Sequence, residues 1–408
     1  MHAPKAVIIG GSMGGLFAGN LLHRAGWDVT LLEKAASPLT SRGTGIVTHP
    51  GLREVMRLAG AHFENRLGIE IARRWAFDAQ GRILSEINFP QNFTSWSRLL
   101  QIMLEAFPRE RYHLSSGVTR IDPGDAQNAA QVHVHDGRVL HADLVVAADG
   151  NRSEIRRQLF QAPPMRYAGY VAWRGLVNRD ALSPMACGWV GENFAFSQIP
   201  GEQIVGYPVL GADHQNTVQI NIVWYRQTSP EALRDILTDA QGHHHPEGIA
   251  PHLLRPEIRQ QARQAAHERL HPAWAEIVDK SSELIVQTIL DGVTDSMNTQ
   301  RVALLGDAAF VARPHVGQGV TKAAGDALAL VRALQEMPSD VPQALRRYSQ
   351  QRVPVGHKAV TMAQQMGAVI NLPDPAMAQW AEHFADPYNL IAETAVEIDG
   401  VSHTTQNG

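Results

Sequence analysis

The sequence contains one cysteine among 408 residues, so no disulfide bond can form within the chain. Chains with so little cysteine are typical of reducing compartments, and we expect a cytoplasmic protein. Cys187 lies in the apolar stretch MACGWV, which favours a small core residue over a nucleophile. No apolar run approaches the length of a membrane span, and the N-terminal residues lack the basic and apolar regions of a signal peptide.

An excess of charge of one sign is also missing. Lys and Arg number 36 against 40 Asp and Glu, which gives a net charge of −4. This balance provides no long-range attraction to nucleic acid or to an anionic membrane, so neither partner is expected. The triplet His243–His245 precedes Pro246 and has no second His or Cys cluster at ligand spacing, so we predict a solvated loop and no metal site.

The N-terminal stretch has the pattern of a dinucleotide-binding βαβ unit. An apolar strand over Ala6–Ile9 leads into GGSMGG, a helical pattern follows, and a second strand ends at Glu33. Gly10 suits the tight turn, Gly15 allows close packing of helix on strand, and Ser12 is small enough for a pyrophosphate to approach. Glu33 can accept hydrogen bonds from ribose hydroxyls. The pattern predicts dinucleotide binding but does not separate NAD from FAD.

A second informative stretch runs from Arg301 to Leu334, RVALLGDAAFVARPHVGQGVTKAAGDALALVRAL. A buried strand is predicted to end at Gly306, so Asp307 at its carboxyl end can accept hydrogen bonds from a polyol. Pro314 stiffens the following loop, and its glycines let bare backbone approach a flat ligand. The free N–H groups at the start of the next helix attract negative charge. These features suit a flavin, although a strand–loop–helix unit whose glycines only make turns has the same pattern.

The order of the elements indicates how the domains are arranged. Strand-like runs joined by turns fill the region from about 167 to 226 and predict an antiparallel sheet, whereas nucleotide-type strands occur before and after it. We therefore predict an α/β fold: a discontinuous Rossmann-type FAD domain, an inserted antiparallel-sheet substrate domain and C-terminal helices. The predicted FAD-binding parts are 1–70, 97–165 and 284–360; a hairpin at 71–96 and the region 166–283 form the substrate domain, and 361–408 form the C-terminal helices and a disordered tail.

Three motifs together resemble one enzyme family. They are GGSMGG with Glu33, DGNRSEIR from Asp149 to Arg156, and GDAAFVARPHVGQG from Gly306 to Gly319. This set resembles the group A FAD-dependent aromatic hydroxylases, the para-hydroxybenzoate hydroxylase superfamily. GTGIVTHPGL and YAGYVAWRGL are similar to the 2,6-dihydroxypyridine hydroxylase branch. The chain departs from the family at Trp96, where an arginine is common, and Arg98 is the nearest substitute.

The resemblance implies an FAD-dependent monooxygenase. Such an enzyme uses NAD(P)H and O2 to hydroxylate a phenolic or hydroxylated N-heteroaromatic small molecule through a flavin C4a-hydroperoxide. With the residue patterns above, it implies FAD contacts at Gly10, Ser12, Met13, Gly14, Gly15, Glu33, Lys34, Thr44, Gly45, Val118, Asp149, Arg156, Asp307, Pro314, Gly317, Gln318, Gly319 and Val320. Asp307 would bind the ribityl chain, the residues from Pro314 to Val320 would line the flavin ring, and a homodimer is one expected state.

Candidates for catalysis and substrate binding come from the loops and the inserted sheet. His49 and His315 lie in loops predicted to face the flavin, and either can act as the base that takes a substrate proton. Substrate-wall candidates are Trp173, Gln198, Tyr207 and Trp224, although aromatic residues at strand spacing also suit an ordinary core. The alternatives are a plain NAD dehydrogenase, a flavin halogenase (whose W-x-W-x-I-P signature is absent), and a redox sensor or flavin oxidoreductase without aromatic hydroxylation.

Overall fold

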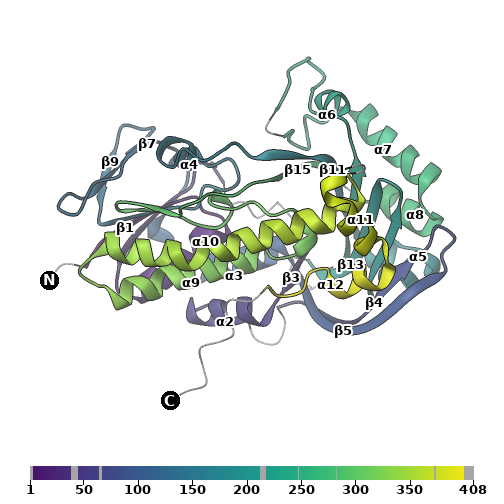
Figure 1. The fold of residues 1–408 in the computed structure, drawn as a ribbon, viewed down its shortest axis with the longest axis horizontal. Helices are drawn as coiled ribbons and strands as arrows, with labels where there is room; N and C mark the ends of the chain where they lie inside the picture. The colour runs from purple at the N-terminus through teal and green to yellow at the C-terminus, as the bar shows by residue number, and fades with distance from the viewer. Residues whose placement is uncertain are drawn as a thin grey trace.

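The computed structural model describes residues 3–37, 45–63, 67–211, 217–246, 248–281, 283–371 and 374–398. The elongated molecule has two halves, each built on a large sheet (Figure 1). No helix of these described ranges has both the length and the apolar character needed to cross a bilayer.

The first half is built on a six-stranded sheet of order β16-β17-β10-β1-β2-β6. Its central strands β1 (Lys5–Ile9), β10 (Leu144–Ala147) and β17 (Val302–Leu304) are fully or almost fully buried and run parallel. On one side β2 (Asp28–Leu32) pairs with β1 and β6 (Tyr112–His113) pairs with β2; on the other, β16 (Asn298–Thr299) is antiparallel to β17. Because parallel strands end at the same edge, the segments after β1, β10 and β17 are brought together.

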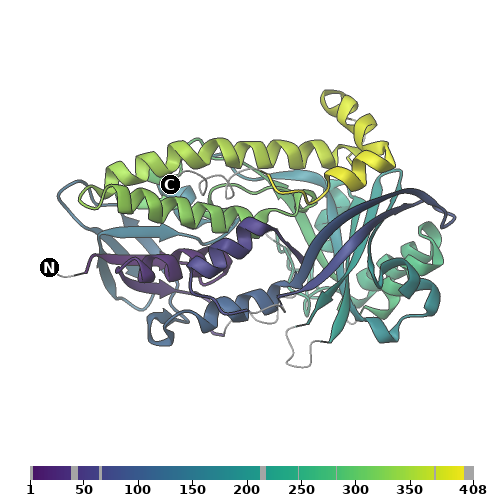
Figure 2. The ribbon, with the colours of Figure 1, turned by 90° about the horizontal axis from the view of Figure 1, so that it is seen from below.

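Helices cover this sheet. Helix α1 (Met13–Arg24) packs on α9 (Gly319–Glu336), and α9 also contacts α2 (Pro50–Leu58) and α10 (Val341–Met366). Figures 1 and 2 show α10 beside α9, extending from this half into the other. Helices α3 (Trp96–Glu105) and α4 (Glu154–Leu159) and a small sheet of β7 (Val118–Asp122), β8 (Ala130–Val134) and β9 (Val139–Ala142) complete this half.

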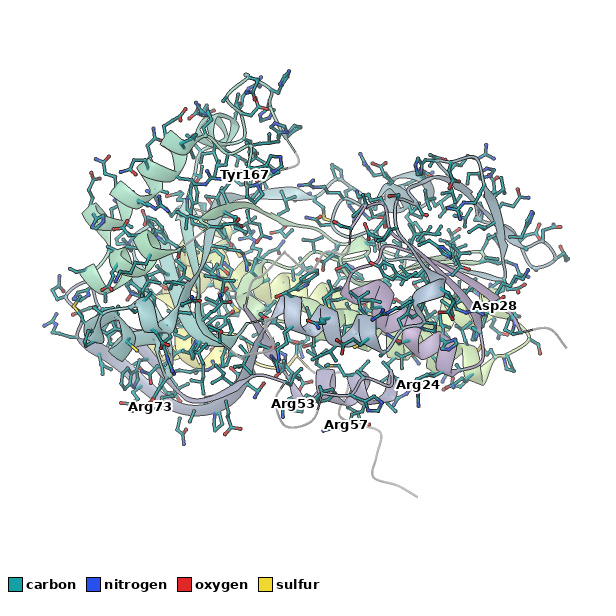
Figure 3. The ribbon with its side chains drawn as sticks, turned by 180° about the vertical axis from the view of Figure 1, so that it is seen from behind. Arg24, Asp28, Arg53, Arg57, Arg73 and Tyr167 are labelled. Carbon is teal, nitrogen blue, oxygen red and sulfur yellow. The ribbon has the colours of Figure 1, made fainter. Side chains whose placement is uncertain are left out.

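The second half is built on an eight-stranded sheet of order β15-β11-β14-β13-β12-β4-β5-β3. Its strands are β3 (Gly45–Thr48), β4 (Ile69–Phe77), β5 (Ile83–Ser95), β11 (Arg166–Asn178), β12 (Asn193–Ile199), β13 (Glu202–Leu210), β14 (Val218–Gln227) and β15 (Ile285–Asp291). Figure 2 shows the long bent strand β5. In Figure 3, Tyr167 of β11 and Arg73 of β4 lie on opposite sides of this half.

The two faces of the eight-stranded sheet have different coverings. On the helix-covered face, α5 (Pro184–Val190), α7 (Pro256–Arg269) and α8 (Pro272–Lys280) bury a core that contains Trp173, Trp224 and Trp274. The other face, which we call the site-facing face, packs on Val47 of β3, Val316, the end of α10 and the helices α11 (Ala378–Ala385) and α12 (Pro387–Glu393). The site-facing face therefore meets the segment that precedes α9.

The predicted fold class is confirmed, with local differences. The stretch GTGIVTHPGL, expected to contribute a loop that faces the flavin, contains the strand β3, because Ile46 and Val47 extend the sheet beside β5. Strands β3 and β15 join the eight-stranded sheet, although the sequence placed both in FAD-binding segments. The proposed domain boundaries stay predictions, and the tail expected to be disordered (402–408) lies outside the described residues.

Candidate functional site

The loop after β1 has room only for glycine at two of its predicted positions. Gly10 has a φ of +106°, and a Cβ there would lie 2.3 Å from the Ala148 carbonyl oxygen; a Cβ on Gly15 would lie 1.9 Å from the Gly10 oxygen. Ser12 is the N-cap of α1, but its side chain makes no capping hydrogen bond. The loop thus brings the start of α1 to the end of β1 and leaves the Ser12 hydroxyl able to bind a phosphate.

Glu33 is held against this loop. Its buried carboxylate accepts hydrogen bonds from the Gly11 nitrogen at 2.7 Å and the Ala35 nitrogen at 2.8 Å. Each carboxylate oxygen has a second lone pair, so ribose hydroxyls can still donate to it. Lys34 lies beside the residue before Val118, with its Cβ 3.7 Å from the Cβ position of Gly117. The structure therefore brings together the residues predicted for the adenosine part.

The second motif lies at the end of β10. Asp149 Oδ1 is buried and has no hydrogen-bond partner, whereas Oδ2 accepts from the Ile155 nitrogen at 3.4 Å. Burial raises the pKa of Asp149. Arg156 is buried and donates to the carbonyl oxygens of Ala308 and Asn151, both at 2.9 Å. Arg156 thus ties this motif to the Asp307 segment, while the unpartnered oxygen of Asp149 is left for a donor from outside the protein.

Asp307 follows β17 at the same sheet edge. Its side chain is accessible to solvent, yet protein surrounds it closely enough for desolvation to raise its pKa. Lys322 of α9 opposes this shift in the pKa of Asp307; its own ammonium is buried, lies 3.5 Å from Asp326 and makes no hydrogen bond. No described residue donates a hydrogen bond to the Asp307 carboxylate, which suits an acceptor for ribityl hydroxyls.

The loop before α9 carries the residues predicted for the flavin ring. Gln318 is the N-cap of α9 without a side-chain cap, so the first N–H groups of this 18-residue helix, from Gly319 and Val320 onward, have no partner from that side chain. A Cβ on Gly319 would meet no atom within 4 Å, so this backbone is open to a ligand. Gly317 serves a different purpose: its φ is +60°, and a Cβ there would lie 2.7 Å from the Cβ of Ala395. Pro314 begins the short 3-10 turn just before it.

His49 is engaged at both ring nitrogens. Its Nδ1 lies 2.9 Å from the Thr321 hydroxyl at the start of α9, and its Nε2 lies 3.1 Å from the Ala395 carbonyl oxygen. The same carbonyl accepts from the side chain of Gln91, and Gln318 donates to the Val396 carbonyl oxygen at 2.6 Å. Burial lowers the pKa of His49. His49 therefore joins α9 to the C-terminal residues 394–398, an arrangement that does not favour a base role.

His315 is buried against the site-facing face. Its Nε2 lies 2.8 Å from the Tyr170 hydroxyl, and its ring centroid lies 4.2 Å from that of Tyr225. Burial, with smaller effects of Arg313 and Arg174, lowers the pKa of His315 to about 3. An imidazole with so low a pKa is a weak proton acceptor near neutral pH. The base role predicted for the two histidines stays a prediction, and this geometry argues against His315 in particular.

The site-facing face presents polar groups beside this loop. Tyr207 and Tyr225 are buried, and neither hydroxyl has a hydrogen-bond partner among the described residues. Asn221 accepts from the Gly45 nitrogen at 2.8 Å, but its buried Nδ2 has no partner. Arg174 of β11 lies near enough to both tyrosines to affect their pKa. Sequence reasoning missed Arg174; its signal was a charge within the otherwise apolar run YVAWRGLV.

The four predicted substrate-wall residues divide between the two faces. Trp173 and Trp224 lie in the core of the helix-covered face, where Trp224 donates to buried Glu202 at 2.9 Å. These tryptophans therefore do not line a site between the two halves, because alternation along each strand turns them to the other side. Gln198 shares a face with Phe196 but lies near the end of β12. Of the four, only Tyr207 lies next to Gly45: a Cβ on Gly45 would be 2.4 Å from the Tyr207 ring. Thr44, predicted to contact FAD, lies outside the described residues.

The three motif ends thus fit FAD. The tight loop after β1 suits a pyrophosphate, Glu33 suits a ribose, and the orphaned oxygen of Asp149 awaits a donor. The accessible Asp307 carboxylate and the open backbone at Gly319 suit the ribityl chain and the ring. The ring would then face the aromatic side chains of the eight-stranded sheet.

Comparison with known proteins agrees with this fit. A family model described as FAD binding domain-like matches residues 167–291. The chain is 27% identical over 366 residues to 2,6-dihydroxypyridine 3-monooxygenase of Paenarthrobacter nicotinovorans, covering 89% of this chain and 91% of that protein. It is 27% identical over 393 residues to 3-amino-4-hydroxybenzoate 2-monooxygenase of Streptomyces cremeus, covering 91% and 88%. The solved structure of 2,6-dihydroxypyridine-3-hydroxylase from Arthrobacter nicotinovorans superposes with a TM-score of 0.85 at 27% identity, covering 90% of this chain and 93% of that one.

Proposed function

We propose that this chain, a member of the group A FAD-dependent aromatic hydroxylases, uses NAD(P)H and O2 to hydroxylate a phenolic or hydroxylated N-heteroaromatic small molecule. When bound and reduced, FAD supplies the activated oxygen, which the protein must keep from water. The named relatives act on a dihydroxypyridine and an amino-hydroxybenzoate, which supports a substrate with at least one ring hydroxyl.

One observation carries the proposal. The segment predicted to line the flavin ring touches the aromatic site-facing face directly, through His315 against Tyr225 at 4.2 Å. A flat substrate held by Tyr207 and Tyr225 would therefore lie beside the helix start at Gly319, where the ring of the cofactor is expected. Burial of both tyrosines limits the water that can reach this place.

Within this function the residues have separate proposed roles. Asp307 holds ribityl hydroxyls, the N–H groups at the start of α9 stabilise negative charge on the ring edge, and Glu33 holds the adenosine ribose. Tyr207 orients the substrate through its hydroxyl, which has no hydrogen-bond partner among the described residues. Asp149 serves the pyrophosphate region and the passing NAD(P)H.

The test is turnover by the purified FAD-bound protein. We expect 2,6-dihydroxypyridine or 3-amino-4-hydroxybenzoate to accelerate NADH or NADPH oxidation, with a product that carries one oxygen atom from labelled O2. If no hydroxylated pyridine or benzoate is oxygenated and the oxygen consumed appears only as hydrogen peroxide, the alternative of a flavin oxidoreductase without aromatic hydroxylation is correct.

A further inference from the structure

The side chain of Arg174 lies on the site-facing side of the eight-stranded sheet. Its neighbours along β11 alternate, with Tyr170 and Ala172 in the core of the site-facing face and Trp173 in the core of the helix-covered face. Arg174 also pairs in register with Val223 of β14, which belongs to the site-facing core. The guanidinium is thus carried toward Tyr225, two residues further along β14, and toward the loop that precedes α9.

The positive charge of Arg174 has no counterion among the described residues. Its Nε is buried and makes no hydrogen bond, and no carboxylate of the described ranges forms an ion pair with the guanidinium. Asp291, at the end of β15 in the same sheet, is itself paired with Arg313 at 2.5 Å.

The titratable groups that face Arg174 from other elements are uncharged near neutral pH. Burial raises the pKa of Tyr207 on β13 well above its usual value and raises the pKa of Tyr225 on β14 to about 12. His315, in the loop before α9, has its pKa lowered to about 3. These three groups therefore do not neutralise the guanidinium.

A half-buried guanidinium without a counterion is costly unless a ligand completes it. Its planar fork matches oxygen anions, whether a carboxylate or an ionised ring hydroxyl. The nearby Tyr207 and Tyr225 hydroxyls add neutral donors without partners. Cation and donors together form a set that recognises an anion attached to a flat ring.

We propose that Arg174 binds an anionic oxygen of the aromatic substrate and thereby selects substrates that are ionised. This inference rests on the proposed function, and it assigns to Arg174 the selection, within that function, of aromatic compounds with an ionised ring hydroxyl or a carboxylate. Where the oxygen is a ring oxygen, the O–H bond breaks, the proton passes to solvent, and the electron pair stays on oxygen. The ring becomes electron-rich without a histidine base, because Arg174 holds the ionised form.

The test measures binding rather than turnover. Oxidised, FAD-bound wild type, Arg174→Gln and Arg174→Lys are titrated with 2,6-dihydroxypyridine and with 3-amino-4-hydroxybenzoate at several pH values, and the flavin absorption change reports binding. We expect Arg174→Gln to weaken binding about 10- to 100-fold and Arg174→Lys to retain part of it. Arg166→Gln is the matched control, since Arg166 is exposed on the same strand, and it should bind as wild type does.

The two compounds distinguish the two sources of the anion. If a ring oxygen is bound, the affinity of wild type for 2,6-dihydroxypyridine rises with pH as the compound ionises, and this rise is lost in Arg174→Gln. If a carboxylate is bound, only 3-amino-4-hydroxybenzoate depends on Arg174, by the same factor at each pH. Arg174→Met replaces the Gln variant if the latter fails to retain FAD.

Two results would overturn the inference: a neutral Arg174 variant that binds both compounds like wild type at every pH, or an FAD-bound wild type that binds neither compound nor benzoate. Failure of the proposed function is a separate result, because it is the absence of an oxygenated product from the wild type. Arg174-dependent binding of an anion can still be observed in that case.

Discussion

The two faces of the eight-stranded sheet differ in how their large aromatic side chains use their polar atoms. On the helix-covered face Trp274 donates to the Ser197 hydroxyl at 2.8 Å, and Trp224 donates to Glu202. On the site-facing face the Tyr207 and Tyr225 hydroxyls have no hydrogen-bond partner among the described residues, and Arg174 Nε and Asn221 Nδ2 beside them are buried and unpaired. Single unpaired buried atoms also occur on the helix-covered face, so it is the grouping of these four side chains beside the loop before α9 that indicates where a ligand can complete the structure.

The largest effect on the free energy of unfolding should come from removing a buried side chain of the helix-covered face. Trp274 of α8 is fully buried there, so Trp274→Ala should lower the free energy of unfolding by about 3–5 kcal/mol through loss of packing and the resulting cavity. Chemical denaturation of the FAD-bound protein measures this. Tyr207→Phe on the site-facing face is the control: the Tyr207 hydroxyl bonds to none of the residues that the structure describes, so the expected change in the free energy of unfolding is within about 0.5 kcal/mol. Equal losses in the two variants would contradict the division between the faces.

The next prediction concerns FAD binding at the edge of the six-stranded sheet, where Asp307 follows β17. Asp307→Ala should weaken FAD binding by about 1.5–3 kcal/mol, because buried ribityl hydroxyls lose a charged acceptor. Equilibrium dialysis against FAD measures this, and exposed Asp295→Ala should retain FAD as wild type does. Wild-type retention by the Asp307 variant would show that the ribityl site lies elsewhere.

The Asp307 carboxylate should also make FAD affinity depend on pH. Desolvation by the surrounding protein raises the pKa of Asp307, so its ionised form, and FAD affinity with it, should be lost on acidification at a higher pH than for an ordinary aspartate. Lys322 lowers the pKa of Asp307, so Lys322→Met should move this loss to still higher pH.

His315, which lies against the site-facing face, should make the free energy of unfolding depend on pH. Its pKa in the folded state is about 3 against about 6.5 when unfolded, so below pH 6.5 the unfolded chain binds a proton that the native state does not. Stability should therefore fall as the pH falls, by about 2 kcal/mol at pH 5 from this group alone. His315→Phe should remove this part of the slope between pH 7 and 5, which chemical denaturation at a series of pH values measures.

The sequence predicts where some residues of the candidate site lie in the fold and does not place others, for physical reasons. Gly10, Glu33 and Asp307 follow strand ends in a parallel sheet, so local pattern alone places them at one edge. Alternation along β11 and β14 predicts two faces but does not say which one helices cover, so the sequence alone does not assign Trp173 to the helix-covered core or Arg174 to the site-facing side. Which elements cover a face is decided by residues far away in the chain.

The contact between His49 and Ala395 also joins distant parts of the chain, so the local sequence does not predict it. It leads to the prediction with the smallest expected effect. The two residues are separated by 346 positions. Nε2 of His49 lies against the Ala395 carbonyl oxygen and Nδ1 against the Thr321 hydroxyl, so neither ring nitrogen is left free to take a substrate proton. His49→Gln should therefore keep FAD and remain tightly coupled, with a loss of hydroxylation well below the roughly 100-fold typical of a missing general base. His315→Gln should behave likewise, since the pKa of His315 is already too low for a proton acceptor.

The measurement is oxygenated product formed per NAD(P)H oxidised, with hydrogen peroxide recorded, across pH for each variant. A loss near 100-fold with added peroxide, partly recovered at high pH, would establish that histidine as the base; the substrate proton would then pass to an imidazole, and activation by Arg174 alone would be insufficient.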